Sequence, residues 1–123
     1  RENTYEFVHT DPDDWMARYF FTGGTMPSDD LLLYFQRDLT VTRHWRIDGT
    51  HYQRTLNAWL KRLDDQRGQV KQIMARVYGA DQALRWLVYW RLFFMGCAEV
   101  FGINNGQEYF VTHLLFEKRE RGQ

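Results

Sequence analysis

Apolar residues in the first third of the chain recur in two short segments that are separated by a loop. Residues 11–21 have helical spacing, with Asp11 as a cap and Pro12 at a favourable first position. A second helix start follows at Ser28, with residues 31–35 as its buried body. This part of the chain is therefore predicted to hold two short helices.

The middle of the chain changes from an alternating pattern to a helical one. Residues 39–47 alternate roughly between apolar and polar side chains, which predicts a strand. Asp48-Gly49 is a turn signal. Apolar residues then recur at helical spacing over residues 52–63 and, after a break near Gly68, over residues 70–77. Two amphipathic helices are predicted here.

The last third holds the most apolar segment, residues 83–101, which follows a separator at residues 79–81. It is apolar nearly all round, which predicts a helix that is buried on most sides. Its longest apolar run carries Arg91 and Glu99 and spans about four turns, too short and too charged to cross a bilayer. A turn at residues 104–106 and a strand over residues 107–116 follow.

The two predicted strands are separated by about sixty residues of helix, and such a pair does not make a stable sheet alone. We expect them at the edge of a sheet whose other strands lie elsewhere. The 123 residues are enough for one small domain or for part of a larger one. Because residue 1 is arginine, we expect that the sequence has been cut, processed or only partly resolved at its N-terminus.

Composition narrows the classes of function. Aromatic residues make up 17% of the chain, and the usual uses of so many rings are a packed core and a ligand pocket. The 16 basic residues balance the 16 acidic ones, so nucleic acid is not an expected partner. A single cysteine excludes an internal disulfide, and the four histidines lack metal-ligand spacing. No signal peptide is recognisable, although an N-terminal address could have been lost. We expect an intracellular location, either cytoplasmic or organellar.

Two short motifs could carry chemistry, and each has a plainer alternative. The paired glycines of the loop at residues 23–28 let the backbone approach a ligand closely, but they also suit a tight connector between helices. Tyr52, near a helix start, could present its hydroxyl to a pocket, but it could equally be a half-buried helix tyrosine.

The apolar helix carries two further candidates. Four aromatic residues are spaced three and four apart and therefore lie on one stripe of the helix: Trp86, Tyr89, Trp90 and Phe93. Such a stripe suits either a packed core or the wall of a pocket for an apolar or cationic acceptor. Cys97 on such a helix is usually inert packing. Glu99 lies in an apolar run, where a carboxylate needs a charged or hydrogen-bonding partner. Arg91 or a group outside the helix could supply it.

Several stretches together resemble the cyclopropane-fatty-acyl-phospholipid synthase family, and most closely its branch of coclaurine-N-methyltransferase-like enzymes. The most specific motif is Gly23-Gly24 with Pro27-Ser28, followed by His51-Tyr52 and Thr55. The matching blocks occur in the family's order and span almost the whole chain: residues 13–16, 18–28, 31–36, 51–55, 88–91, 98–102 and 104–106.

The resemblance implies an α/β fold, namely the C-terminal part of a Rossmann-like class I methyltransferase, here mostly helical with two edge strands. Residues 1–123 would be the acceptor-side portion. S-adenosylmethionine would be bound mainly by residues outside the chain, where the family also has a catalytic Glu-His pair. His9 lies too close to Trp15 to be a further family histidine, so we interpret it as part of a surface loop.

The resemblance also implies roles for individual residues. Tyr52 matches a tyrosine that helps to hold a bicarbonate base, and Cys97 matches a cysteine of the same pocket in some members; these are the candidate catalytic residues. Tyr89, Trp90 and Phe93 match the wall of the acceptor pocket. Cys97 favours carbon methylation of lipid, since N-methylating members carry alanine there, whereas the matching blocks favour the amine branch.

The leading hypothesis is a methyltransferase that uses S-adenosylmethionine and acts on a lipid alkene or a small amine, with these 123 residues inactive alone. The alternative is a non-catalytic structural or interaction subunit of a larger assembly. The expected partners are the acceptor, the missing N-terminal half or a partner chain, and a membrane surface contacted peripherally.

Overall fold

The computed structural model describes residues 4–7 and 14–119, and the chain divides into two compact units. The first comprises Arg1–Ile47 and Val111–Gln123, and the second comprises Asp48–Phe110. The predicted helix start at residues 11–12 and the loop around His9 lie outside the described residues.

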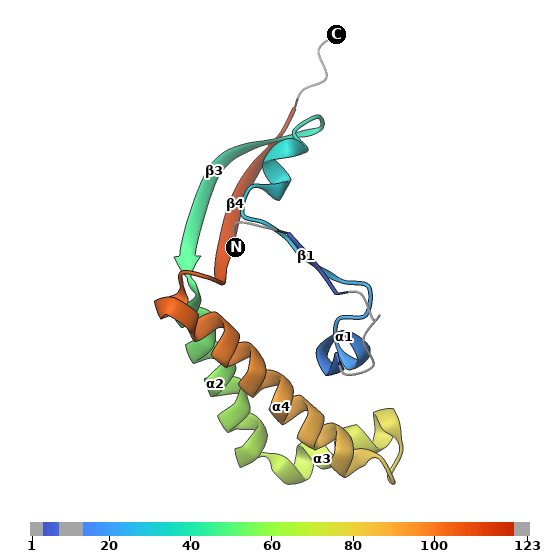
Figure 1. Cartoon of the computed structure of the whole chain (residues 1–123). Coiled ribbons are helices and arrows are strands. Elements are labelled where there is room, and N and C mark those ends of the chain that lie inside the picture. The colour runs from blue at the N-terminus through green and yellow to red at the C-terminus, as the bar shows by residue number, and fades with distance from the viewer. Residues whose placement is uncertain (1–3, 8–13, 120–123) are drawn as a thin grey trace. The chain divides into compact units, whose positions relative to one another are not determined.

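The first unit is built on a ribbon of two strands, β3 (Leu39–Asp48) and β4 (Phe110–Lys118), which pair with each other (Figure 1). The Arg119 backbone N–H donates to the Asp38 carbonyl at 3.1 Å, so the end of β4 meets the start of β3. Both predicted strands are confirmed. The second begins three residues later than predicted, because the segment before it is taken up by the preceding turn.

Two short strands in this unit were not predicted. β1 (Tyr5–Glu6) pairs antiparallel with β2 (Thr25–Met26), and strands of two residues are too short to show alternation. The paired glycines connect α1 (Trp15–Tyr19) to β2 and extend this ladder. Phe7 N–H donates to the Gly24 carbonyl at 2.8 Å, and Gly23 N–H donates to the Phe7 carbonyl at 3.2 Å. Gly23 has a φ of 71°, which favours glycine.

The helix α1 has caps at both ends and finishes two residues earlier than predicted. The Asp14 carboxylate accepts from Ala17 N–H at 2.9 Å, which fixes the N-terminus. Thr22 Oγ1 donates to the Ala17 carbonyl at 2.6 Å after the last turn. Ala17 is fully buried and is the residue through which this helix packs into the described part of the chain.

The second predicted helix is a single 3₁₀ turn, η1 (Leu31–Tyr34), and its predicted burial is wrong. Tyr34 is 76% exposed and Phe35 is 68% exposed, so the described part of the chain leaves these two rings largely uncovered. The turn is held to the ribbon from its N-terminal side by Asp29. That carboxylate accepts from Thr112 Oγ1 at 2.6 Å and lies 2.9 Å from His44 Nε2.

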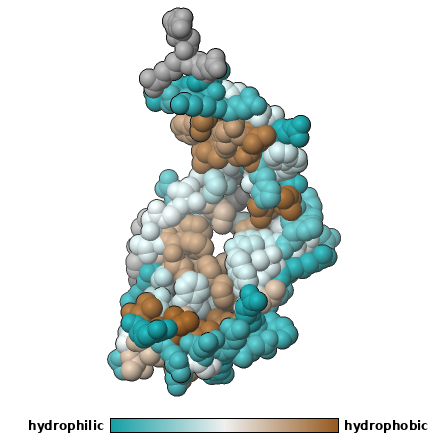
Figure 2. All heavy atoms as spheres, turned by 180° about the vertical axis from the view of Figure 1, so that it is seen from behind, coloured by the Kyte–Doolittle hydropathy of each residue, from teal (hydrophilic) through white to brown (hydrophobic). Residues whose placement is uncertain are grey.

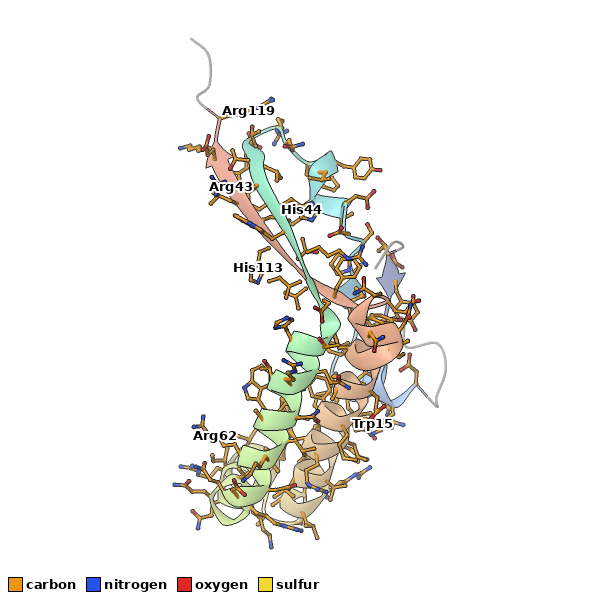
Figure 3. All side chains as sticks on the ribbon, turned by 90° about the vertical axis from the view of Figure 1, so that its left-hand side faces the viewer. Trp15, Arg43, His44, Arg62, His113 and Arg119 are labelled. Atoms are coloured by element: carbon orange, nitrogen blue, oxygen red, sulfur yellow. The ribbon has the colours of Figure 1, made fainter. Side chains whose placement is uncertain are left out.

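Ionisable side chains lie on both sides of the ribbon. Figure 3 shows His44 on the side of the 3₁₀ turn and His113 on the other side. Burial raises the pKa of Asp29, but its hydrogen bonds to Thr112 and His44 outweigh burial, so the net pKa is lowered. The carboxylate is therefore the charged link between the turn and both strands.

The second unit is a group of three helices. α2 (Gly49–Asp65) and α4 (Ala83–Gly102) lie side by side, and α3 (Arg67–Tyr78) packs mainly against α4 (Figure 1). Leu56 of α2 and Leu87 of α4 are fully buried between the helices. The predicted amphipathic and apolar helices are confirmed, with shifted ends.

Two predicted breaks lie in helices. Asp48 is the N-cap of α2 and Gly49 is its first residue, so the predicted turn is a helix start. Gly68 lies inside α3, and the chain breaks at Gln66 instead. Both differences have one cause: a glycine in the first turn of a helix gives the same sequence signal as a glycine in a loop.

The prediction that α4 is buried on most sides is wrong for the described chain. Its fully buried residues are Ala83, Leu87 and Ala98, since two neighbouring helices cannot cover it all round. An apolar stripe of this helix is 39–51% exposed: Leu84, Val88, Leu92 and Met95. Figure 2 shows apolar surface open to view between hydrophilic regions.

By length and composition alone, Ala83–Gly106 could also cross a membrane. This is weak evidence, because core helices of water-soluble proteins meet the same criterion. Of the two partners considered for Glu99, Arg91 or a group outside the helix, Arg91 is engaged elsewhere. It binds Asp64 of α2, and Glu99 is exposed to solvent.

Candidate functional site

The contact between α2 and α4, which we call the seam, has two different edges. Tyr52 and Trp59 of α2 are seven residues apart, about two turns, so they lie on the same side of that helix. Across from them α4 presents rings and one thiol. We call this the aromatic edge, and it comprises Tyr52, Trp59, Trp90, Phe93, Phe94, Cys97 and Phe101.

Tyr52 is placed at this edge by the rings of both helices. Its ring lies 4.7 Å from that of Phe101 and 6.1 Å from that of Trp59, and both contacts are edge-to-face. Burial raises the pKa of the Tyr52 hydroxyl, and the nearby Cys97 raises it further. The hydroxyl is therefore protonated at neutral pH and can both donate and accept a hydrogen bond.

The first turn of α2, which carries Tyr52, is fixed by a capping carboxylate and a closely packed turn. Asp48 accepts from Thr50 N–H at 3.0 Å and also from the Thr50 hydroxyl. A side chain on Gly49 would overlap the backbone of Phe101 and Tyr109. The backbone around Tyr52 therefore has little freedom to move.

The turn that packs on this helix start is η2 (Ile103–Gly106), which the sequence predicted as a turn. Asn104, Asn105 and Gly106 all have positive φ angles, of 49°, 53° and 76°. Such angles suit asparagine and glycine. A Cβ at Gly106 would overlap the backbone N–H groups of Gly49 and Thr50, so this glycine allows the close approach.

Cys97 is a half-buried thiol on the aromatic edge. Burial raises its pKa to about 11. At neutral pH the sulfur is therefore a protonated, weakly polar group, and it is a poor nucleophile. The arrangement gives Cys97 a place in the wall of the site close to Tyr52.

The predicted acceptor residues lie along the same helix as Cys97. The Trp90 ring is 5.6 Å from that of Phe93 and 5.8 Å from that of Phe94. Tyr89 packs edge-on against Trp86 at 5.5 Å, and its hydroxyl accepts from Arg85 Nε at 2.9 Å. Ring contacts thus join Trp90 and Phe93 to the aromatic edge, whereas Tyr89 contacts Trp86 and Arg85 near the start of α4.

The opposite side of the seam, which we call the ionic edge, is held by one ion pair. Arg91 Nε and Nη2 donate to the two carboxylate oxygens of Asp64 at 2.6 and 3.0 Å. This hydrogen bonding lowers the pKa of Asp64 and outweighs the opposing effect of burial. Both groups are more than a third exposed, so the pair is screened by water.

Sequence reasoning missed two rings of the aromatic edge, Trp59 and Phe101. It grouped Phe94 with the other rings of the apolar helix but left it out of the predicted stripe. Trp59 and Phe94 are 6.0 Å apart and connect the helix of Tyr52 to the helix of Trp90. The spacing of seven between residues 52 and 59 was available as a signal. It could not be used, because only the structure shows which helix α2 packs against.

The described residues do not by themselves fit S-adenosylmethionine. A cavity of about 490 Å³ is lined by six consecutive residues, Tyr34 to Leu39, and lies in a bend of the chain next to η1. The paired glycines follow a helix, whereas a nucleotide-binding glycine loop follows a strand and begins a helix. Within residues 4–7 and 14–119, no three His, Cys, Asp or Glu side chains meet in a way that could hold a metal ion.

Comparison with known proteins places these features in context. The sequence profile of a family described as mycolic acid cyclopropane synthetase matches residues 1–110. A pavine N-methyltransferase of Thalictrum flavum subsp. glaucum is 39% identical over 118 residues, which cover 94% of this chain and 33% of that protein. An (S)-coclaurine N-methyltransferase of Papaver somniferum is 40% identical over 118 residues, with 94% and 34% covered.

A solved structure resembles the chain closely. The crystal structure of a coclaurine N-methyltransferase bound to N-methylheliamine and SAH superposes with a TM-score of 0.79 at 38% sequence identity. The match covers 94% of this chain and 34% of that one. The predicted fold class is therefore confirmed as the C-terminal portion of this methyltransferase fold. The chain spans about a third of the length of the curated relatives that it matches.

Proposed function

The chain belongs to the mycolic acid cyclopropane synthetase family, and from this we propose that it is the acceptor-binding portion of an N-methyltransferase for small amines that uses S-adenosylmethionine. The observation that carries the proposal is the aromatic edge, where Tyr52 and Cys97 lie with the rings of Trp90 and Phe93 on one side of the seam. The relatives are N-methyltransferases, which supports an amine as the acceptor. The alternative of a non-catalytic subunit is not favoured by these relatives.

The donor supplies an electrophilic methyl group, and the residues of this chain bind and orient the acceptor. An amine must have a free electron pair before it can take a methyl group, so a base has to remove its proton first. Neither Tyr52 nor Cys97 is suited to that task at neutral pH, because burial raises the pKa of both groups. We therefore propose that both act by positioning the acceptor and that the base comes from elsewhere.

Bicarbonate is one candidate for that base. The protonated hydroxyl of Tyr52 is a hydrogen-bond donor, which is what an anionic oxygen at this position would need. The rings of Trp90 and Phe93 exclude water from the acceptor and offer apolar faces to its carbon framework. Tyr89 completes the proposed acceptor wall on α4.

A lipid alkene is the second candidate acceptor. The family description and the thiol of Cys97 support it, since cyclopropane-forming relatives act on lipid chains. Methylation of an alkene passes through a carbocation, which electron-rich ring faces also stabilise. The aromatic edge is compatible with both acceptors, so only transfer experiments separate them.

The test uses the complete polypeptide that contains these residues, with a labelled methyl donor. Separate reactions offer a secondary amine, a tertiary amine and vesicles of an unsaturated phospholipid. We expect label in the amines. Label in the lipid alone would establish the second candidate instead, and transfer to no acceptor of either class would overturn the proposed methyltransferase function.

A further inference from the structure

We propose that Trp59 is a specificity-determining residue whose exposed ring receives the aryl body of an amine acceptor. The inference rests on the proposed function and adds a residue on α2 to a wall that was otherwise assigned only to α4. The juxtaposition that carries it is the position of Trp59 between Tyr52 and Phe94.

The rings of the aromatic edge form an unbroken series across the seam. Tyr52 contacts Trp59 at 6.1 Å, Trp59 contacts Phe94 at 6.0 Å, and Phe94 contacts Trp90 at 5.8 Å. The candidate positioning hydroxyl and the candidate acceptor wall are therefore connected through Trp59. An acceptor that extends from Tyr52 along this series of rings meets Trp59 first.

Trp59 is held in place by ring contacts, yet it is much more exposed to solvent than its apolar neighbours on α2. It is 45% exposed, whereas Leu56 and Leu63 on the same helix are 0% and 8% exposed. Its ring is nearly perpendicular to that of Tyr52, at 85°, and inclined by 56° to that of Phe94. Two aromatic partners hold the indole in place, while nearly half of the residue remains open for a further contact.

The charges near Trp59 favour an uncharged aryl group over the amine nitrogen as its ligand. Arg62 follows three residues later, about one turn along α2, and projects from the side of the helix away from α4 (Figure 3). A positive charge about one turn away along the helix makes the surroundings of this indole less favourable for another cation. The nitrogen is therefore assigned to the Tyr52 end of the edge and the aryl body to Trp59.

The experiment compares two acceptors in the complete polypeptide. One is a secondary amine fused to a single aromatic ring, and the other is the same amine with a second aryl ring attached. We expect Trp59→Ala to lower the ratio of kcat/KM for the two-ring acceptor to that for the one-ring acceptor by about tenfold, because only the second ring loses its partner. Trp59→Phe, which keeps an aromatic face, should recover most of the ratio.

The matched control is Trp45→Ala, because Trp45 of β3 is also 45% exposed but is not part of the seam. Its ratio should equal that of the wild type. Each ratio is internal to one variant, so a partly unfolded preparation does not change it. Equal losses for both acceptors in the Trp59 variants, or an unchanged ratio, would overturn the inference while leaving the proposed function intact. Failure of the wild type to methylate either amine would overturn both.

Discussion

The two edges of the seam join the same pair of helices but are suited to different tasks. On the ionic edge, Arg91 and Asp64 satisfy each other through two hydrogen bonds. On the aromatic edge, rings such as Trp59 meet edge to face and leave apolar surface open. Groups that bond each other fully, as Arg91 and Asp64 do, hold the two helices together. Rings that keep part of their surface exposed can in addition receive a ligand.

Both edges depend on how closely the start of α2 approaches the end of α4, and Gly49 sets that approach. We expect Gly49→Ala to have the largest effect on folding, because the new methyl group would overlap the carbonyl oxygens of Phe101 and Tyr109. The free energy of unfolding should fall by about 3 kcal/mol. Denaturant unfolding followed by circular dichroism measures this change.

The control for this substitution is Gly68→Ala in α3, where a Cβ meets no atom within 4 Å. Alanine has the higher helix propensity, so this variant should be stabilised by up to about 1 kcal/mol. The two substitutions are chemically identical and should change stability in opposite directions. Similar losses in both would contradict the close approach at Gly49.

The reactivity of the Cys97 thiol measures whether the aromatic edge excludes water. Burial raises its pKa from 9.0 to about 11, so the folded protein should hold roughly a hundredfold less thiolate at pH 8 than the unfolded chain. Alkylation followed by mass spectrometry should slow accordingly in the native state. The pKa of the thiol is higher in the folded protein than in the unfolded chain, so the folded state binds this proton more tightly. The protonated thiol therefore contributes fully to the free energy of unfolding below pH 9, and this contribution is lost as the pH rises toward 11. Equal alkylation rates with and without denaturant would show that water reaches the edge.

Hydrophobic periodicity was sufficient to predict the helices of the second unit and the two long strands. Residues 52–63 and 83–101 each show the pattern of one helix, and both helices are present. The burial of α4 and of η1 could not be predicted, because periodicity shows that a face is apolar but not what covers it. Tyr34 and Leu84 are apolar or aromatic in the sequence and exposed in the structure.

The candidate site was predictable only in part for the same reason. Tyr52 and Cys97 stood out in the sequence, but only a resemblance gave them roles. The structure adds that burial, and to a smaller extent the nearby Cys97, raises the pKa of Tyr52. Trp59 and Phe94 carry no motif, and their importance depends on the pairing of two helices that are distant in the sequence. The ion pair between Arg91 and Asp64 could not be predicted either, because the two residues are 27 positions apart in the sequence.

Removal of one hydroxyl from the aromatic edge should change catalysis without changing the fold. We expect Tyr52→Phe in the complete polypeptide to lower kcat by about tenfold, the loss of one positioning hydrogen bond. The ring contacts with Phe101 and Trp59 do not need the hydroxyl, so the melting temperature should stay within about 2 °C. Steady-state kinetics and thermal melts on the same preparations measure both. Unchanged kcat would remove Tyr52 from the proposed site.

The smallest effect is expected on the ionic edge, where Asp64→Asn should alter stability alone. The carboxylate pKa is lowered mainly by the hydrogen bonds from Arg91, so its contribution is present above the unfolded pKa of about 4 and is lost as pH falls below it. Asp65→Asn is the control, because Asp65 pairs with Lys61 of its own helix. Thermal melts at pH 7 should show a larger loss for Asp64→Asn, and high salt should reduce the difference. The ratio of two-ring to one-ring acceptor turnover should match the wild type in both variants. A changed ratio for Asp64→Asn would show that the ionic edge also shapes the acceptor site, and the distinction between the two edges would then be wrong.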